Sequence, residues 1–209
     1  MYKILKDKKV IIFDYDDTLV KTRESKLGSL VETAEIYNLK LSKQEIISRW
    51  HGPYLEMIQN IFGDIDDLNN IRFNLEKIAR KYLMQAYTDA IETVNSLLKN
   101  FKVSILTSSE RKVVIEDLIK LGFSVDSFSY IQTSEDTDFH KPDPRVFENM
   151  ISLYESIGIS KEELLYVGSD MNDYLASSQC GIDFTGINRK SFKLDEKVFV
   201  INELVELIR

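Results

Sequence analysis

The sequence is poor in cysteine, in histidine and in long apolar runs. Its 209 residues include one cysteine, Cys180, and two histidines, so no internal disulfide can form and soft ligands for a metal are scarce. A lone cysteine fits a reducing, cytoplasmic setting. The apolar runs, such as 10–13, are too short to cross a membrane, and the first residues turn polar too soon for a signal peptide. We therefore expect a cytoplasmic protein without a membrane partner.

Positive charge is also in short supply. Lys and Arg number 27 against 34 Asp and Glu, which gives a net charge of −7 at pH 7. An acidic chain is a poor electrostatic match for a polyanion, so we expect no nucleic-acid partner. Apolar residues are not lacking, because the hydrophobic fraction is 44% and the chain has 11 Phe and 10 Tyr. This composition excludes a disordered chain and predicts a globular one.

Glycine and proline are scarce, at 8 and 3 residues, so the few that occur mark boundaries. Residues 8–19 read as a buried strand and an acidic turn, and residues 21–88 read as helices without a strand. In residues 89–209, strand patterns alternate with helix patterns. The expected strands are 10–13, 103–106, 128–132, 164–167, 182–184 and 198–200. The expected helices are 91–98, 114–121 ending at Gly122, 144–157, 174–180 ending at Gly181, and a short last helix capped by Asn202.

Strands that alternate with helices predict an α/β fold with a doubly wound, Rossmann-like parallel sheet. The first strand is separated from the others by the helical segment. We therefore expect a core of residues 1–20 and 89–209, with a helical bundle of residues 21–88 inserted after the first strand. Sheets of this kind bind ligands at the carboxyl ends of their strands, so the residues at those ends are the candidates for function.

Three carboxylates lie at the end of the first strand: Asp14, Asp16 and Asp17. Side chains two residues apart in an extended segment point the same way, so Asp14 and Asp16 can converge. Converging carboxylates repel each other unless a cation lies between them, and hard oxygen ligands suit Mg²⁺. The alternative is a solvated, aspartate-rich turn.

Polar residues also follow the next strand and occupy a later loop. Thr107 and Ser108 precede a helix, where a hydroxyl and free amides favour an anion. The alternative is that Ser108 or Ser109 only caps that helix. Lys141 lies in a loop stiffened by two prolines, where it would serve as a point charge for a phosphate.

The strand at 164–167 is followed by two more carboxylates, Asp170 and Asp173. Their spacing places them on one face of the helix that begins there, where they can bind a metal, cap the helix, or do both. Taken together, the strand ends combine carboxylates for a metal with hydroxyl and ammonium donors for an anion. Phosphoryl transfer requires this combination.

The order of these groups resembles that of the haloacid dehalogenase superfamily of phosphohydrolases over nearly the whole chain. Residues 14–19 resemble its first motif, Asp-x-Asp-x-Thr. Thr107 matches the second motif, Lys141 the third, and residues 168–173 the acidic fourth. The helical insertion is similar to the cap domain of the phosphoglycolate phosphatase and β-phosphoglucomutase branch.

The sequence departs from the family pattern at two positions. Asp17 stands where the first motif often has glycine, and Ser169 stands where the fourth motif often has aspartate. Asp170 is positioned to replace the missing carboxylate, which leaves the choice between Asp170 and Asp173 as the metal ligand open.

The resemblance implies that Asp14 attacks phosphorus and that Asp16 acts as the general acid and base. It implies Mg²⁺ as the cofactor, with candidate ligands Asp14, Asp16, Asp170 and Asp173. It implies phosphate-binding roles for Thr107, Ser108 and Lys141. In the helical insertion, Arg49, His51 and Tyr54 are the candidate substrate contacts, whereas Trp50 is expected to pack in the bundle.

The function expected from the resemblance is Mg²⁺-dependent hydrolysis of a small phosphorylated metabolite through an aspartyl-phosphate. Asp16 argues against a dehalogenase, because a halide leaving group needs no proton. A phosphomutase of the β-phosphoglucomutase type and a non-catalytic binding protein that retains the fold remain as alternatives.

Overall fold

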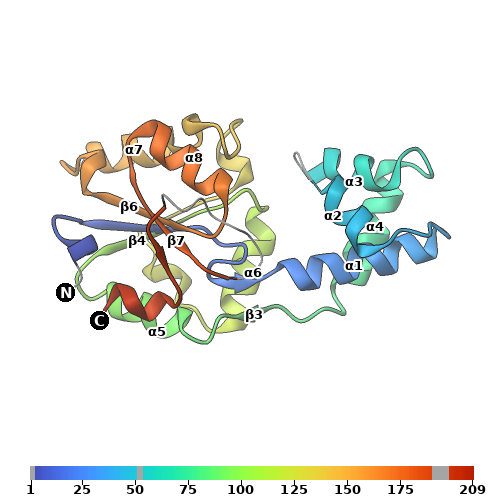
Figure 1. Ribbon diagram of the computed structural model, residues 1–209, viewed down its shortest axis with the longest axis horizontal. Coiled ribbons are helices and arrows are strands. Elements are labelled where there is room, and N and C mark those ends of the chain that lie inside the picture. The colour runs from blue at the N-terminus through green and yellow to red at the C-terminus, as the bar shows by residue number, and fades with distance from the viewer. Residues whose placement is uncertain (1–2, 51–53, 190–197) are drawn as a thin grey trace. The chain divides into compact units, whose positions relative to one another are not determined.

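The computed structural model describes residues 3–50, 54–189 and 198–209 of the chain. The chain divides into two compact units (Figure 1). The first, here called the core unit, comprises Met1–Lys21 and Gln85–Arg209; the second, here called the inserted unit, comprises Thr22–Met84.

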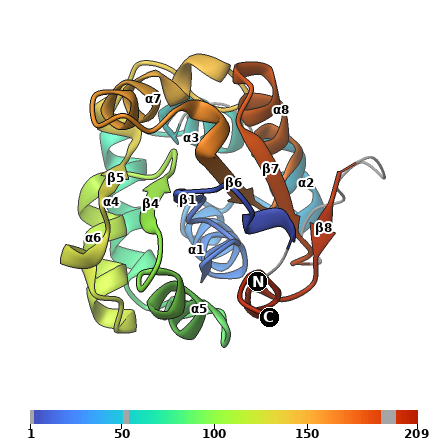
Figure 2. The ribbon, with the colours of Figure 1, turned by 90° about the vertical axis from the view of Figure 1, so that its left-hand side faces the viewer.

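A parallel six-stranded sheet runs through the core unit in the order β5-β4-β1-β6-β7-β8 (Figure 2). The four residues of β1 are fully buried, which explains why the run lacks alternation: both faces of the strand are covered. The doubly wound α/β fold is therefore confirmed. The strands are β1 (Val10–Phe13), β4 (Lys102–Leu106), β5 (Tyr130–Gln132), β6 (Leu164–Gly168), β7 (Asp183–Ile187) and β8 (Val200–Ile201).

The register of the three central strands fixes where they end. Phe13, the last residue of β1, lies opposite Ile105 of β4 and Val167 of β6. All three strands therefore reach the same edge of the sheet within one residue. The polar residues that follow these strands therefore lie close together at that edge of the sheet.

Helices cover both faces of this sheet (Figure 2). On one face, Val10 and Ile12 of β1 pack with Phe147, Met150 and Tyr166 in a continuous apolar cluster. This face is covered by α7 (Glu148–Glu155) and α8 (Met171–Cys180), and the other by α5 (Ala90–Leu97) and α6 (Arg111–Leu121). The expected ends of α6 and α8 are confirmed, since Gly122 and Gly181 adopt φ values of 90° and 81°.

The inserted unit is a helical bundle with its own core. Leu30, Ile46, Ile58 and Ile71 are buried in it, and Trp50 packs against that cluster, as expected. Its helices are α1 (Arg23–Ile36), α2 (Lys43–Arg49), α3 (Tyr54–Phe62) and α4 (Leu68–Ala79).

Three local predictions are wrong. Residues 21–88 do contain strand, because β2 (Val20–Lys21) pairs with β3 (Gln85–Ala86) in an antiparallel ladder; two-residue strands are too short to show a periodicity. The segment expected to be a single helix from Pro144 begins with a 3₁₀ turn, Pro144–Phe147. Asn202 does not cap the last helix. The 3₁₀ helix Leu204–Leu207 is capped from Glu203, because the Glu206 carboxylate accepts the backbone N–H groups of both 202 and 203.

Gly28 in α1 is required by a close contact within the inserted unit. A Cβ atom at this position would overlap Cε1 of the Tyr82 ring. We expect Gly28→Ala to lower the free energy of unfolding by about 1–3 kcal/mol through overpacking. In a Tyr82→Leu background the same change should be neutral or stabilising, because alanine favours helix over glycine by about 1 kcal/mol. Urea unfolding of the four proteins of this cycle measures the coupling, and equal losses in both backgrounds would contradict the contact.

Candidate active site

Asp14 is buried at the carboxyl edge of the sheet, immediately after β1. Its N–H donates to the Val167 carbonyl at 2.9 Å, which extends the β1–β6 ladder by one residue. The chain then turns through Asp17, whose φ of 54° is left-handed; aspartate tolerates this conformation better than most residues. The turn places Thr18 beside Asp14, and the Thr18 hydroxyl donates a hydrogen bond to Asp14 Oδ2 at 3.0 Å.

Lys141 joins the first and last acidic motifs. Its ammonium lies 2.6 Å from Asp14 Oδ1 and 2.6 Å from Asp173 Oδ1, and 3.0 Å from the Tyr166 hydroxyl. The side chain is 10% exposed. One buried cation therefore serves two carboxylates that lie 159 residues apart in sequence (173 − 14).

Both carboxylate oxygens of Asp173 are occupied by protein donors. Oδ1 accepts from Lys141 and from the Tyr166 hydroxyl, and Oδ2 accepts from the N–H groups of Ser169 and Asp170 at 2.9 and 3.2 Å. Gly168 allows this approach, because a Cβ there would lie 2.5 Å from Asp173 Oδ2. Asp173 is thus a structural anchor for Lys141 and for the loop after β6.

Asp170 caps α8, as one interpretation of the sequence expected. Its Oδ1 accepts from the N–H of Asp173 at 2.9 Å. Burial, and then the charge of Asp173, raise the pKa of Asp170 to about 6.

Asp16 lies nearby but has other partners. Its Oδ2 accepts a hydrogen bond of 2.6 Å from the Ser109 hydroxyl, and its backbone carbonyl accepts from the Ser169 hydroxyl at 3.4 Å. Burial raises the pKa of Asp14, and the charges of Asp173 and Asp16 raise it further, while Lys141 lowers it. The structure therefore brings Asp14 and Asp16 into electrostatic contact, with separate hydrogen-bond donors for each.

Thr107 is buried at the end of β4. Its Oγ1 accepts from the N–H of Ser109 at 3.1 Å, and its own N–H donates to the Gln132 carbonyl. The alternative that Ser108 or Ser109 caps α6 is wrong, because the cap is Glu110. The reason is that the Thr107 hydroxyl accepts a hydrogen bond from the Ser109 amide, so the helix begins only at Arg111.

Lys141 carries its charge in this setting. Burial opposes that charge, but the carboxylates of Asp14 and Asp173 outweigh it and raise the pKa of Lys141 well above its ordinary value. Even so, the Lys141 ammonium has three carboxylates around it, those of Asp14, Asp170 and Asp173, and Asp16 adds its charge beside Asp14. The site has an excess of negative charge that favours a further cation.

The family model for haloacid dehalogenase-like hydrolases matches residues 11–187 of this chain. The chain belongs to this family. The hydrolase is 26% identical over 214 residues to pyrophosphatase PpaX of Bacillus cereus (strain AH820), covering 95% of this chain and 94% of that protein.

Two solved structures share the fold of the hydrolase. One is described as a predicted phosphoglycolate phosphatase from Haemophilus somnus 129PT, with a TM-score of 0.80, 18% identity and 97% of each chain covered. The other, YfnB of Bacillus subtilis bound to magnesium, is described as a haloacid dehalogenase-type hydrolase, with a TM-score of 0.78, 20% identity and 96% of each chain covered. Of the helices that the structure describes, none has the length and apolar character to cross a bilayer.

The oxygen donors of the site fit Mg²⁺. Among the described residues, no three His, Cys, Asp or Glu side chains converge on a point where they would hold a metal by themselves. Mg²⁺ in phosphoryl-transfer sites needs less, since one or two carboxylates suffice when waters and substrate phosphate complete the shell. Asp14, the carbonyl of Asp16 and Asp170 offer such a set, whereas Asp173 already accepts four hydrogen bonds from protein donors, two on each oxygen.

The candidate substrate contacts lie in the inserted unit. Arg49 Nη1 donates to the Ile61 carbonyl at 3.3 Å, and the ring of Tyr54 lies 5.9 Å from the guanidinium of Arg72. His51 falls outside the described residues. The roles of these three residues in substrate binding stay predictions.

Sequence reasoning missed two contributors to the core-unit site. The sequence pattern predicts Tyr166 only as a strand residue, but its hydroxyl contacts both Lys141 and Asp173; a tyrosine within a buried apolar strand is the available signal. Arg189 donates to the Thr18 carbonyl and to Asp89, both at 3.2 Å. No local pattern identifies this arginine, because its partners are distant in sequence.

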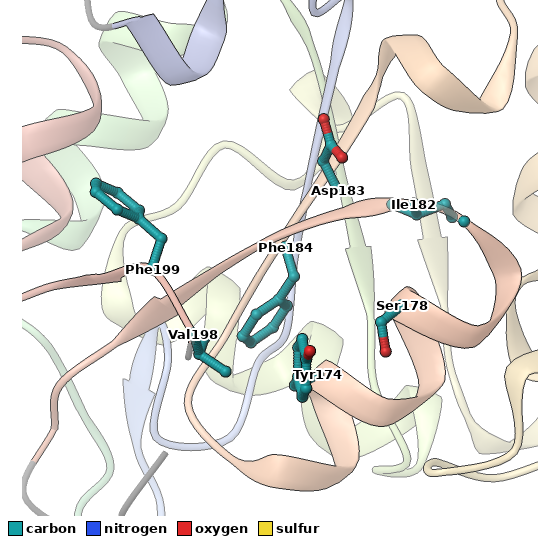
Figure 3. A pocket seen from close by; sticks show the side chains of 8 residues that line it. Tyr174, Ser178, Ile182, Asp183, Phe184, Val198 and Phe199 are labelled. Carbon is teal, nitrogen blue, oxygen red and sulfur yellow. The ribbon is translucent and has the colours of Figure 1, made fainter. Parts of the chain in front are cut away.

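A separate hollow of about 320 Å³ runs along α8 and β7 (Figure 3). The rings of Tyr174 and Phe184 meet in it, 5.7 Å apart. None of the site carboxylates lines this hollow.

The raised pKa of Asp170 makes the metal-free protein sensitive to pH. The charged form is disfavoured on folding, so the penalty is absent below about pH 4 and fully present above about pH 6. We expect Asp170→Asn, which keeps a capping oxygen, to raise the Tm in EDTA by about 2–6 °C at pH 7.5, and by much less at pH 4.5. Thermal unfolding measures this. Asp138→Asn, at an exposed position, controls for net charge, and an equal gain in both variants would contradict the burial effect.

Proposed function

We propose that the hydrolase is a Mg²⁺-dependent phosphatase that acts on a small phosphorylated metabolite through an aspartyl-phosphate on Asp14. One observation carries the proposal. Asp14 is buried at the sheet edge, and its Oδ1 lies 2.6 Å from the ammonium of the charged Lys141. Asp16, two residues later in the sequence, accepts a hydrogen bond from a different donor, the Ser109 hydroxyl. A nucleophile, a separate acid and base, and a cation for the phosphoryl oxygens are thereby in reach of one another.

In the first step, a carboxylate oxygen of Asp14 forms a bond to phosphorus and the bond to the leaving oxygen breaks. Asp16 gives its proton to that oxygen, which departs as an alcohol. In the second step, water attacks phosphorus and gives a proton to Asp16. The bond between phosphorus and Asp14 then breaks, which releases phosphate and restores both side chains.

The remaining residues of the site bind and orient the phosphoryl group. Lys141 offers a fixed positive charge, held by Asp173 and Tyr166. The loop at Thr107 and Ser108 would contribute the two hydroxyls and the Ser108 amide as donors beside the start of α6. Preorganised donors of this kind supply much of the rate acceleration in phosphoryl transfer.

Mg²⁺ would be held by Asp14, the Asp16 carbonyl and Asp170, and would reduce the repulsion between the Asp14 carboxylate and an incoming phosphate dianion. Asp170 is preferred to Asp173 because the latter already accepts four hydrogen bonds. The magnesium bound in YfnB supports the choice of ion.

The nature of the relatives guides the choice of substrates. The pyrophosphatase relative makes inorganic pyrophosphate a candidate, and the phosphoglycolate phosphatase fold neighbour makes phosphoglycolate another. Small phosphate esters complete the panel. The net charge of −7 continues to argue against a nucleic-acid substrate.

We expect Asp14→Asn to reduce phosphate release from every accepted substrate by at least about 10³-fold, because an amide cannot form the phosphoryl intermediate. EDTA should abolish wild-type turnover, and Mg²⁺ should restore it. The measurement is phosphate release from para-nitrophenyl phosphate, pyrophosphate, phosphoglycolate and sugar phosphates, with circular dichroism to show that the variant folds.

Three results would contradict the proposal. An active Asp14→Asn variant would exclude the covalent mechanism. Slow hydrolysis with fast isomerisation of a sugar phosphate would indicate a mutase. No turnover of any compound, with retained binding of phosphate, would indicate a non-catalytic protein.

A further inference from the structure

The hydroxyl of Ser109 has no part in the chemistry described above, yet it makes one of the shortest contacts of the site. It donates to Asp16 Oδ2 at 2.6 Å. We propose that Ser109 is a positioning residue for Asp16, holding one carboxylate oxygen so that the other faces the leaving group. This inference rests on the proposed function, because it assigns a task to the acid and base of that reaction.

Ser109 is itself held on both sides of its hydroxyl. Its N–H donates to Thr107 Oγ1 at 3.1 Å, and its carbonyl accepts from the N–H of Ser134 at 3.1 Å. Thr107 is in turn tied to the end of β5 through the Gln132 carbonyl. The hydroxyl is therefore presented from a loop fixed to two neighbouring strands, which is the support that a positioning group needs.

Asp16, by contrast, lies on the turn after β1. The N–H of Asp17 donates to the Val20 carbonyl at 2.8 Å, and the Ser169 hydroxyl contacts the Asp16 carbonyl. These contacts fix the backbone of the turn and leave the rotation of the Asp16 side chain to its own hydrogen bonds. The bond from Ser109 restricts that rotation.

The two carboxylates of the first motif draw on different donors. Asp14 is held by Lys141 and Thr18, and Asp16 by Ser109. Removal of the Ser109 hydroxyl should therefore disturb proton transfer while leaving the nucleophile and its cation in place. Ser109 keeps its own proton throughout, since the proton that reaches the leaving oxygen comes from Asp16.

This separation gives the inference a specific kinetic signature. An alkoxide leaves only if it receives a proton, whereas a nitrophenolate is stable enough to leave without one. A misdirected Asp16 should thus slow the reaction of alkyl esters much more than that of para-nitrophenyl phosphate. A general loosening of the site would slow both equally.

The experiment compares kcat/KM, which reports the step that forms the aspartyl-phosphate, across phenyl phosphates of increasing phenol basicity and the best alkyl ester of the panel. We expect Ser109→Ala to lower kcat/KM about 10-fold or more for the alkyl ester and less than about 3-fold for para-nitrophenyl phosphate. Asp16→Asn should show the same trend with a larger loss. Ser109→Thr, which keeps a hydroxyl, should recover most of the activity.

Ser134→Ala is the matched control. It removes a serine hydroxyl beside the same loop and keeps the backbone N–H that contacts Ser109, so its kcat/KM should equal that of the wild type on all substrates. Thermal unfolding of each variant shows whether it is folded.

The outcomes separate this inference from the proposed function. Turnover that depends on Asp14 and Mg²⁺ supports the phosphatase assignment. If, in that case, Ser109→Ala lowers kcat/KM equally for all leaving groups, or leaves kcat/KM unchanged, the positioning role is wrong and the phosphatase assignment stands. If Asp16→Asn itself shows no dependence on the leaving group, the assignment of Asp16 as the acid fails, and the positioning role fails with it.

Discussion

The buried ammonium of Lys141 is the interaction on which the rest of the site depends. It lies between the carboxylates of Asp14 and Asp173, and without it these two buried carboxylates would face each other with hydroxyl and amide donors in place of a positive charge. Removing one member of a buried ion pair leaves an uncompensated charge, which costs about 3–5 kcal/mol. The end of β1, the loop after β5 and the start of α8 are thus joined by charge, and a phosphate-binding cation is fixed in the same arrangement.

This interaction is available only because the sheet is parallel and in register. The residue pairs at the ends of β1, β4 and β6 face each other directly, so a shift of one residue in any strand would move its terminal polar group to the opposite face. Gly168 adds a second requirement, because any side chain there would displace Asp173. The positions of the acidic side chains in the site therefore depend on the strand register and on the close packing at Gly168.

The two departures from the family pattern have structural consequences of different kinds. Asp17 occupies a left-handed position that glycine would adopt freely, so this substitution preserves the turn. Ser169 places a hydroxyl 3.4 Å from the Asp16 carbonyl, where a carboxylate would add negative charge to an already acidic cluster. The carboxylate beside it, Asp170, remains partly exposed and caps α8.

The fold class, the family and the order of the polar groups at the strand ends could be predicted from the sequence, because a buried strand, an amphipathic helix and a glycine cap each leave a local pattern. The pairing of each oxygen with its hydrogen-bond donor could not be predicted in this way and is seen in the folded molecule. Asp173 proved to be held by Lys141 and two amides, Tyr166 joined the site from within a strand, and Ser109 proved to be a partner of Asp16 and not a helix cap. Contacts of the site join residues up to 171 positions apart, as between Thr18 and Arg189. Their geometry depends on strand register and packing, which have no local signature.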